Sequence, residues 1–161
     1  MNRAIAFVLA LAAAGCASFG GALRPGASTE SEVRATMGAP AMEFTDPDGS
    51  RQLVYPKGPL GTDTLMVYLG KDGVLRDDVR NVLTDQTFES VKAGLTEKDI
   101  QRLIGPPAQV IPFALSNTHA WDYRYMDTWG YLAIFSVTFD ANGIVVSKSK
   151  ARINDGKSRG M

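Results

Sequence analysis

The sequence contains little of what most metal and redox sites require. Cys16 is its single cysteine and His119 its single histidine among 161 residues. One cysteine cannot form an internal disulfide framework or a multi-cysteine zinc site, and one histidine leaves little room for metal or acid–base chemistry. The sequence also has no phosphate-binding glycine loop and no metal-ligand spacing. We therefore expect this chain to use no cofactor and no metal.

An excess of either charge is also missing, because 17 Lys and Arg residues balance 17 Asp and Glu residues. Proteins that bind nucleic acid usually show a basic surplus, and so do proteins held to anionic membrane surfaces by charge. We therefore expect no nucleic-acid partner. The apolar content of 45% is ordinary, so a packed core is feasible.

A catalytic set of nucleophile, base and orienting group is not visible, so we expect no catalytic residue and no enzyme. His119 could pair with a Ser or an Asp, but it follows the polar stretch 115–118, where a solvated loop histidine is the simpler interpretation. Asp46, Asp48 and Gly49 are similar to the start of a calcium loop. They lack the remaining ligands at the proper spacing, so a plain turn is the preferred interpretation.

The N-terminal stretch is predicted to be a targeting segment. Arg3 precedes an apolar run over residues 4–14, which is too short to span a bilayer and is followed by small residues. Residues 13–16 read Ala-Ala-Gly-Cys and resemble the lipobox of bacterial lipoproteins. In that family the cysteine is diacylated and becomes the new N-terminus, which predicts a signal peptide over residues 1–15. The alternative is ordinary cleavage after residues 12–14, which would leave Cys16 as a free thiol.

Two stretches of the sequence predict nearly the same short helix. In the downstream copy Thr96 can cap the N-terminus, and Asp99 stands at the capping-box spacing. Gly105 then supplies a left-handed C-terminal cap, and prolines prevent continuation. The upstream copy, residues 29–40, repeats this pattern at a constant offset. The matched residues are Thr29, Glu32, Val33, Met37, Gly38 and Pro40, paired with Thr96, Asp99, Ile100, Ile104, Gly105 and Pro107.

Strand signals follow each predicted helix, so the chain reads as a tandem repeat. Alternating apolar residues and Gly-containing turns predict antiparallel hairpins in both halves. The predicted fold class is α+β, with two tandem units, each of one or two short helices packed on a three- to four-stranded antiparallel sheet. The expected divisions are a signal peptide over 1–15, a glycine-rich tether over 16–22, a first repeat over 23–83, a second repeat over 84–150 and a polar tail over 151–161.

The second repeat contains an ordered set of motifs. It runs helix, Gly-apolar-Thr, helix, Gly-x-Pro, Trp-x-Tyr, strand, and a turn with Gly before an apolar residue. The residues in this set are Val91, Gly94, Leu95, Thr96, Ile100, Leu103, Gly105, Pro107, Trp121, Tyr123, Val137, Thr138, Phe139, Gly143 and Ile144. This order resembles the small outer-membrane assembly lipoproteins of the BamE (SmpA/OmlA) type. The first repeat matches the pattern more loosely.

The resemblance implies a non-catalytic lipoprotein that is anchored in the bacterial outer membrane through Cys16 and faces the periplasm. Its expected role is a protein-binding scaffold in outer-membrane protein assembly or envelope integrity, and its expected partners are outer-membrane assembly proteins or other envelope proteins. The assembly factor has one such unit, whereas the tandem arrangement resembles the β-lactamase inhibitory proteins. That second resemblance implies an alternative function, the inhibition of a secreted or envelope hydrolase.

Aromatic residues around a predicted hairpin tip form the candidate partner-binding site. Tyr125, Trp129 and Tyr131 bracket residues 126–128. Tyr and Trp are enriched among the residues that dominate binding energy at protein interfaces. The alternative is that these three rings fill the core face of the sheet. Trp121, Tyr123, Phe135 and Phe139 are assigned to the core.

Overall fold

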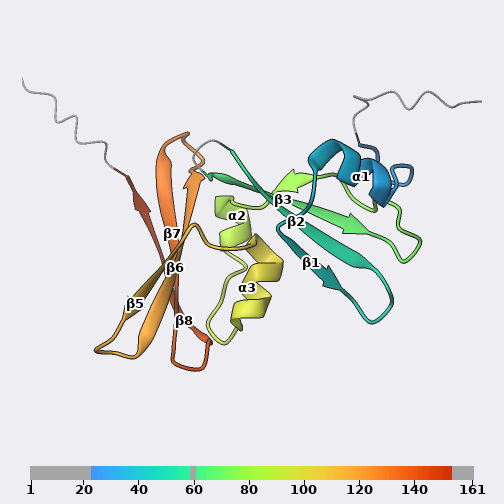
Figure 1. Ribbon diagram of the computed structural model, residues 1–161. Helices are drawn as coiled ribbons and strands as arrows, with labels where there is room; N and C mark the ends of the chain where they lie inside the picture. The colour runs from blue at the N-terminus through green and yellow to red at the C-terminus, as the bar shows by residue number, and fades with distance from the viewer. Residues whose placement is uncertain (1–22, 59–60, 154–161) are drawn as a thin grey trace, which may run out of the picture.

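The computed structural model describes residues 23–58 and 61–153, which form two α+β units in succession (Figure 1). The first unit places β1, β2, β3 and β4 in one four-stranded antiparallel sheet, and the second unit places β5, β6, β7 and β8 in another. Short helices accompany each sheet, which confirms the predicted fold class. The elements are α1 (Glu30–Met37), β1 (Met42–Thr45), β2 (Arg51–Lys57), β3 (Asp63–Leu69), β4 (Arg80–Asn81), α2 (Asp85–Phe88), α3 (Glu97–Ile104), β5 (Gln109–Phe113), β6 (Thr118–Met126), β7 (Leu132–Phe139) and β8 (Val145–Arg152).

Helices α1 and α3 begin with the same capping structure. The Thr29 hydroxyl accepts a hydrogen bond from the Glu32 backbone N–H, and the Thr96 hydroxyl accepts one from that of Asp99. In both helices the acidic side chain accepts a hydrogen bond from the backbone N–H of the capping threonine, which completes the predicted capping box. Each N-cap residue also forms a bridge to a later turn of its own unit, Thr29 to Val74 and Thr96 to Ile144. These matched contacts support the tandem repeat.

The two helices also end alike, but not in the predicted conformation. Gly38 has φ 85° and ψ −162°, and Gly105 has φ 82° and ψ −166°. Both φ values are positive, as a left-handed cap requires, whereas the extended ψ lies in a region that is nearly exclusive to glycine. The extended ψ sends the chain directly toward the next strand instead of reversing it over the helix end.

The first sheet is covered on both faces. One face packs against α1 and forms the cluster Val33, Leu53, Tyr55, Val67, Leu69 and Leu75. The opposite face contributes a second cluster, Val54, Met66 and Val82. Consecutive residues of β2 are therefore buried on alternate faces, which explains why Leu53, Val54 and Tyr55 form an unbroken apolar run.

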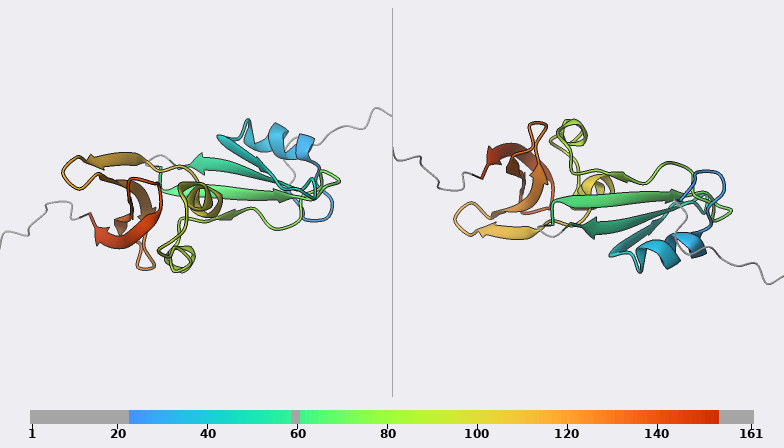
Figure 2. Two further views of the ribbon diagram at one scale, coloured as in Figure 1. Left: turned by 90° about the horizontal axis from the view of Figure 1, so that it is seen from below. Right: turned by 90° about the horizontal axis from the view of Figure 1, so that it is seen from above.

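Helix α3 lies between the two sheets, on the side of the first sheet opposite to α1 (Figure 2). Gln52 of β2 donates a hydrogen bond to the Arg102 carbonyl at 2.5 Å. The Arg102 guanidinium in turn donates to Asp46 at 2.6 Å and stands 5.1 Å from the centre of the Phe44 ring. One helix of the second unit thus joins the two units, because it contacts both sheets.

The second sheet has one buried face and one open face. The buried face packs on Phe88 of α2 and on Ile100 and Ile104 of α3, and it contains the predicted core aromatics Trp121, Tyr123, Phe135 and Phe139. Leu103 is only partly buried against this cluster. It shares the helix with Ile100 and Ile104, both of which are fully buried.

Two elements of the described chain are set by their neighbours. Helix α2 is four residues long, with Thr84 as its N-cap. Strand β2 continues past Tyr55 through Pro56 to Lys57. Strand β8 continues to Arg152 and so includes the first two residues of the predicted polar tail. The predicted signal peptide, Cys16 and the tether lie outside the described residues.

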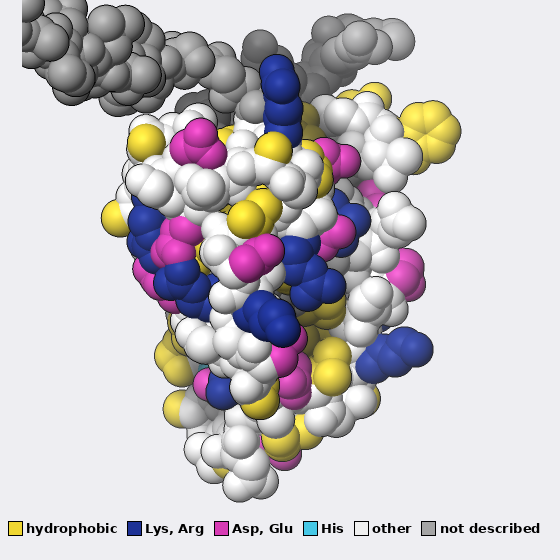
Figure 3. Space-filling view, turned by 90° about the vertical axis from the view of Figure 1, so that its right-hand side faces the viewer, with side chains coloured by type: hydrophobic (Ala, Val, Ile, Leu, Met, Phe, Trp, Pro, Cys, Tyr) yellow, Lys and Arg dark blue, Asp and Glu magenta, His cyan; other side chains and the backbone are white. Residues whose placement is uncertain are grey.

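The surface on the α1 side mixes both charge signs (Figure 3). Arg34 pairs with Glu30 and Glu43, and Arg51 also pairs with Glu30. Interleaved charges of this kind produce no extended field of one sign. In the described part of the chain, no helix has the length and hydropathy needed to cross a membrane.

Candidate functional site

Residues 127–131 join β6 to β7 and are called the aromatic loop below. Its turn is closed by the Asp127 N–H, which donates to the Tyr131 carbonyl at 2.9 Å, and by the Gly130 N–H, which donates to the Asp127 carbonyl at 2.8 Å. The Asp127 carboxylate also accepts the N–H groups of Trp129 and Tyr131, both at 2.9 Å. Gly130 has φ 78°, which this three-residue hairpin turn requires. The loop is thus held by its own polar groups.

Within residues 23–58 and 61–153 the same turn occurs at three other places, and Trp129 is the exception among the residues at its third position. The turns that start at Asp46, Gly70 and Asp140 have the same pair of backbone hydrogen bonds and a glycine with positive φ at the fourth position. Their third positions hold Asp48, Asp72 and Asn142, residue types that turns favour. The aromatic loop has Trp129 at that position. The turn therefore does not need the indole ring.

The aromatic loop is fastened to α2 by one carboxylate. Asp85 Oδ2 accepts hydrogen bonds from the Thr128 backbone N–H at 3.1 Å and from its hydroxyl at 2.8 Å. Asp85 Oδ1 accepts the Lys150 ammonium at 2.9 Å and the Tyr125 hydroxyl at 3.1 Å. These bonds, the one from Lys150 foremost, hold the pKa of the Asp85 carboxyl well below its usual range. Asp85 therefore stays ionised at any physiological pH.

Tyr125 is a core residue and not part of an exposed binding surface. Its side chain is 2% exposed and contacts Phe88 edge-on, with 4.7 Å between ring centres. Burial, together with the hydrogen bond to Asp85, raises the pKa of the Tyr125 hydroxyl to about 12. The period of two along β6 decides this placement, because Tyr125 follows Trp121 and Tyr123 on the buried face. The alternative, that this ring fills the core face, is correct.

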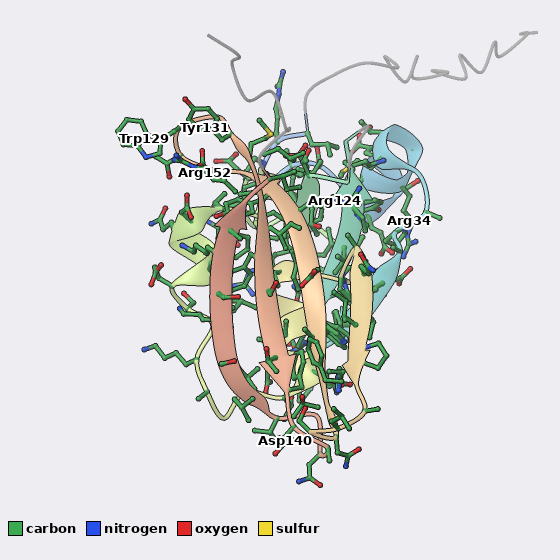
Figure 4. All side chains as sticks on the ribbon, turned by 90° about the vertical axis from the view of Figure 1, so that its left-hand side faces the viewer. Arg34, Arg124, Trp129, Tyr131, Asp140 and Arg152 are labelled. Atoms are coloured by element: carbon green, nitrogen blue, oxygen red, sulfur yellow. The ribbon has the colours of Figure 1, made fainter. Side chains whose placement is uncertain are left out.

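Trp129 and Tyr131 are exposed, and they lie with Arg152 at one end of the second sheet (Figure 4). Trp129 is 78% exposed and Tyr131 is 58% exposed. The Arg152 guanidinium stands over the Tyr131 ring, 4.6 Å from its centre. A hollow of about 310 Å³ opens beside them. Its walls include Asp85, Thr128, Trp129, Ala133, Lys150 and Arg152.

Ion pairs of Arg152 with Asp127, and of Lys150 with Asp85 and Glu89, organise the charges around this hollow. Arg152 Nε donates to Asp127 Oδ2 at 2.6 Å. Burial works against ionisation of Asp127, but its hydrogen bonds with Tyr131 and Arg152 lower the pKa of the carboxyl overall. Burial likewise disfavours the Lys150 ammonium, whereas hydrogen bonds to Asp85 and Glu89 raise the pKa of Lys150 overall. The shifts of Asp127 and Lys150 thus both favour the charged form of the side chain.

His119 was predicted to lie in a solvated loop, and this prediction is wrong. The residue belongs to strand β6. Its Nε2 is 2.7 Å from Glu97 Oε1, and its ring stacks on Phe139 with 5.2 Å between centres. The strand begins at Thr118, one residue before it, which carries the imidazole to the edge of the buried face. This contact ties β6 to the start of α3.

Sequence reasoning missed the polar residues that build the site, namely Asp85, Asp127, Lys150 and Arg152. Asp127 could have been found, since the Asp-x-x-Gly spacing of residues 127–130 repeats that of residues 46–49 and 140–143. Arg152 could have been placed by extending the strand, because Lys148, Lys150 and Arg152 alternate with small residues after Val145. Asp85 carries no such signal, because its partners lie far away in sequence.

The lipidation site and the calcium-like stretch are the other two candidate sites of the sequence analysis. Cys16 lies outside the described residues. The stretch with Asp46 and Asp48 is a hairpin turn, in which Asp48 accepts hydrogen bonds from the Ser50 backbone and hydroxyl. Among residues 23–58 and 61–153, no three His, Cys, Asp or Glu side chains gather as a metal-ligand set.

Comparison with solved structures finds a crystal structure of a putative beta-lactamase inhibitor protein from Streptococcus mutans. The similarity covers 77% of this chain and 82% of that chain, with a TM-score of 0.35 and 14% sequence identity. A similarity of this size supports no statement about function.

Comparison of sequences points to the second unit. Over 69 residues the chain is 35% identical to outer membrane protein assembly factor BamE of Haemophilus influenzae. The aligned stretch covers 40% of this chain and 48% of that protein. The chain therefore spans about half the length of the curated relative that it matches. Residues 80–149, from β4 to the middle of β8, match the family model described as the outer membrane protein assembly factor BamE domain, as the motifs of the second repeat predict.

Proposed function

We propose that this chain is a non-catalytic envelope lipoprotein that binds other proteins of the outer membrane as a scaffold, through the exposed rings of the aromatic loop. The observation that carries the proposal is the match of residues 80–149 to the domain of the outer membrane protein assembly factor BamE. The relative from Haemophilus influenzae has the same description. Assembly proteins of the outer membrane are thus the partners that we expect first.

The position of Trp129 supports a role in binding. The third position of the three equivalent turns holds a polar residue that suits the turn, whereas Trp129 exposes 78% of its surface there. An exposed tryptophan contributes nothing to a core, and large aromatic side chains on a rigid frame are the usual anchors of protein interfaces. The hydrogen bonds of Asp127 and Asp85 provide that frame. The backbone that carries the ring is therefore held in place and needs little ordering when a partner binds.

The proposed membrane anchor is the diacylated Cys16. Two acyl chains hold a protein stably, where one chain would bind reversibly. Seven residue steps join this cysteine to Leu23, the first described residue, and a fully extended chain spans at most about 25 Å over them. An anchored chain would thus keep Leu23 within that distance of the bilayer surface, where the first unit meets other membrane-bound envelope proteins.

Affinity capture from detergent-solubilised bacterial envelopes tests the proposed function. The bait is the full chain, and the comparison is between wild type, Trp129→Ala and the control Leu115→Ala. Leu115 is a matched control, because it is a fully exposed apolar residue in the turn between β5 and β6. We expect outer-membrane assembly proteins to be recovered with wild type and with Leu115→Ala, and to be lost with Trp129→Ala.

Two other outcomes would contradict the proposal. If one envelope hydrolase is recovered in stoichiometric amount and loses activity in the complex, the alternative function of hydrolase inhibition replaces the scaffold. If no envelope protein depends on Trp129, the aromatic loop is not the binding surface. Melting temperatures of the three baits, measured alongside, show that any difference reflects binding and not unfolding.

A further inference from the structure

The hollow beside Trp129 contains hydrogen-bond donors that no described residue uses, whereas its carboxylate oxygens already accept hydrogen bonds. Both oxygens of Asp85 and both oxygens of Asp127 already accept hydrogen bonds from the loop, from Tyr125 or from β8. Arg152, in contrast, uses only Nε toward the described residues. A guanidinium has five N–H donors, so its two terminal nitrogens remain available. A ligand of this hollow must therefore bring an acceptor, and a negatively charged one fits best.

Arg152 is also held in one orientation. Asp127, only 9% exposed, fixes Nε from one side, and the Tyr131 ring lies against the guanidinium. A guanidinium that is fixed in this way presents a flat fork, which matches a carboxylate through two parallel hydrogen bonds. Lys150, two residues earlier on the same face of β8, is paired with Asp85 and Glu89, so the acceptor of the ligand falls to Arg152. Trp129 forms the apolar wall beside them.

One wall of the hollow belongs to an edge strand, since β8 contributes Lys150, Ala151 and Arg152 to the lining. In the described chain β8 is the last strand of its sheet, and its outer edge is bonded at Val145, whose N–H donates to the Leu95 carbonyl and whose carbonyl accepts the Gly94 N–H. The edge beyond Val145 pairs with no further strand of the described chain. Every residue of β8 after Val145 is exposed. Such an edge offers backbone N–H and C=O groups to a further strand, and side chains of that strand would alternate between the two faces of the sheet. Every second residue of an added strand would therefore point to the side of Lys150, Arg152 and Trp129.

We propose that β8 and the hollow beside Trp129 bind an extended acidic peptide segment of a partner protein, which adds to the sheet edge and places one carboxylate on the fork of Arg152 and an apolar side chain on Trp129. The inference rests on the proposed function and gives the chemistry of the partner. The carboxylate belongs to an Asp or Glu side chain or to a free C-terminus. A peptide satisfies both the fork and the strand edge, whereas a lipid headgroup satisfies only the fork.

Selection from a displayed library of random peptides of about eight residues, the length of an ordinary strand, tests this inference. The selection is made on the full purified chain and is counter-selected on Arg152→Gln. The matched control is Arg124→Gln, since Arg124 is an exposed arginine of β6 on the opposite face of the same sheet. We expect enriched peptides to share one acidic position with an apolar residue two places away. Their affinity should fall about tenfold or more with Arg152→Gln and stay unchanged with Arg124→Gln.

Three further measurements define the contact. An enriched peptide is made in three altered forms. Loss of binding when Gln replaces Glu identifies a side-chain carboxylate, and loss with an amidated C-terminus identifies a terminal carboxylate. Loss of binding with N-methyl groups on alternate backbone nitrogens identifies addition of the peptide as a strand. Binding should shift the fluorescence of Trp129 to shorter wavelength, and the shift should vanish with Trp129→Phe, since Trp121, the other tryptophan, is already buried. Arg152→Lys, which keeps the charge without the fork, should bind more weakly than wild type while its melting temperature is retained.

The inference is overturned if no acidic peptide is enriched against Arg152→Gln, or if vesicles of anionic phospholipid bind through Arg152 while peptides do not. Either result leaves the proposed function standing, as long as envelope capture depends on Trp129. Enriched peptides without any captured envelope protein would instead support the peptide site and contradict the scaffold. The two proposals can therefore fail separately.

Discussion

At the scale of single residues, Tyr125 and Trp129 belong to the same chemical class but experience opposite environments. Tyr125 is 2% exposed, whereas Trp129 is 78% exposed. Alternation along β6 sends Tyr125 inward, and the turn that begins at Asp127 ends this alternation before Trp129. Nearness in sequence therefore says little about a shared surface when a strand end lies between two residues.

The two rings should thus respond differently to truncation. Trp129→Ala should change the free energy of unfolding by less than about 0.5 kcal/mol, because the ring packs on no core. Tyr125→Ala should lower it by about 3–5 kcal/mol, because a buried ring and its contact with Phe88 are lost. Chemical denaturation of both variants measures this. A large loss with Trp129→Ala would make it a structural residue and remove the support for the binding site.

The Asp85 carboxylate should make stability depend on pH. Its pKa in the folded chain lies well below the ordinary 3.8, so its bonds stabilise the fold fully above that value and are lost as pH falls through the folded pKa. Asp85→Asn should lower the free energy of unfolding by about 1–3 kcal/mol at neutral pH. The difference from wild type should shrink as pH falls from about 5 to about 2. The control is the exposed Asp78→Asn, and a difference that is constant with pH would refute the assignment.

At the scale of secondary-structure elements, α3 has two neighbours. Ile100 and Ile104 are buried against the second sheet, while the Arg102 carbonyl and side chain contact the first. A helix with apolar residues at this spacing predicts one buried stripe. The apolar spacing does not predict the polar contacts that Arg102 makes with the first unit.

Truncation along α3 separates its buried and half-buried positions. Ile104→Ala should lower the free energy of unfolding by about 2–5 kcal/mol, because it leaves a cavity in a fully packed site. Leu103→Ala should lower it by only about 1 kcal/mol, because Leu103 is partly buried and loses less apolar contact. Denaturant titration of the two variants gives the ranking. Equal losses would mean that Leu103 packs as tightly as Ile104.

Gly38 and Gly105, which end α1 and α3, can be compared to test how closely α3 packs on the first sheet. A Cβ at Gly105 would lie 2.8 Å from Thr64 Cγ2 of the first sheet, whereas a Cβ at Gly38 would meet nothing within 4 Å. Both Ala variants should lose about 1–3 kcal/mol from backbone strain alone. Gly105→Ala should lose about 1–3 kcal/mol more from crowding across the joint. Thermal unfolding of both compares them, and equal losses would show that α3 does not pack closely on the first sheet.

At the scale of the whole molecule, the two repeats share local structure but not surroundings. Both helices start with the same capping box and end with the same glycine conformation. The first sheet is nevertheless covered on both faces, whereas the second keeps one face open. The open face, the free edge of β8 and the aromatic loop all belong to the second unit, which is the part that matches the BamE domain.

The lipid anchor is a prediction about the whole chain in its membrane. Mass spectrometry of the mature protein should find Cys16 at the N-terminus with two acyl chains on a thioether-linked glycerol, and Cys16→Ser should release the protein from the membrane fraction. This prediction is based on the lipobox-like sequence Ala-Ala-Gly-Cys, which follows an apolar run. A mature chain that begins elsewhere and keeps a free thiol would disprove the anchor.

The sequence by itself determined the features that depend on near neighbours. The capping boxes at Thr29 and Thr96, the alternation of β6 and β7, and the turn at Asp140 are all local, because backbone hydrogen bonds and strand periodicity act over a few residues. The repeat then implied the sheet of each unit. The core positions of Trp121, Tyr123, Phe135 and Phe139 followed from the same periodicity.

Only the tertiary structure decided which distant groups meet. Asp85 meets Thr128 and Lys150, and Arg102 meets Asp46, because packing of the helices on the sheets brings together residues that are far apart in the chain. The same packing placed His119 against Glu97 and covered the second face of the first sheet. Such pairs leave no periodic trace in the sequence, since each partner alone is an ordinary polar residue. The candidate site was therefore visible as Trp129 and Tyr131, but its charged frame was not.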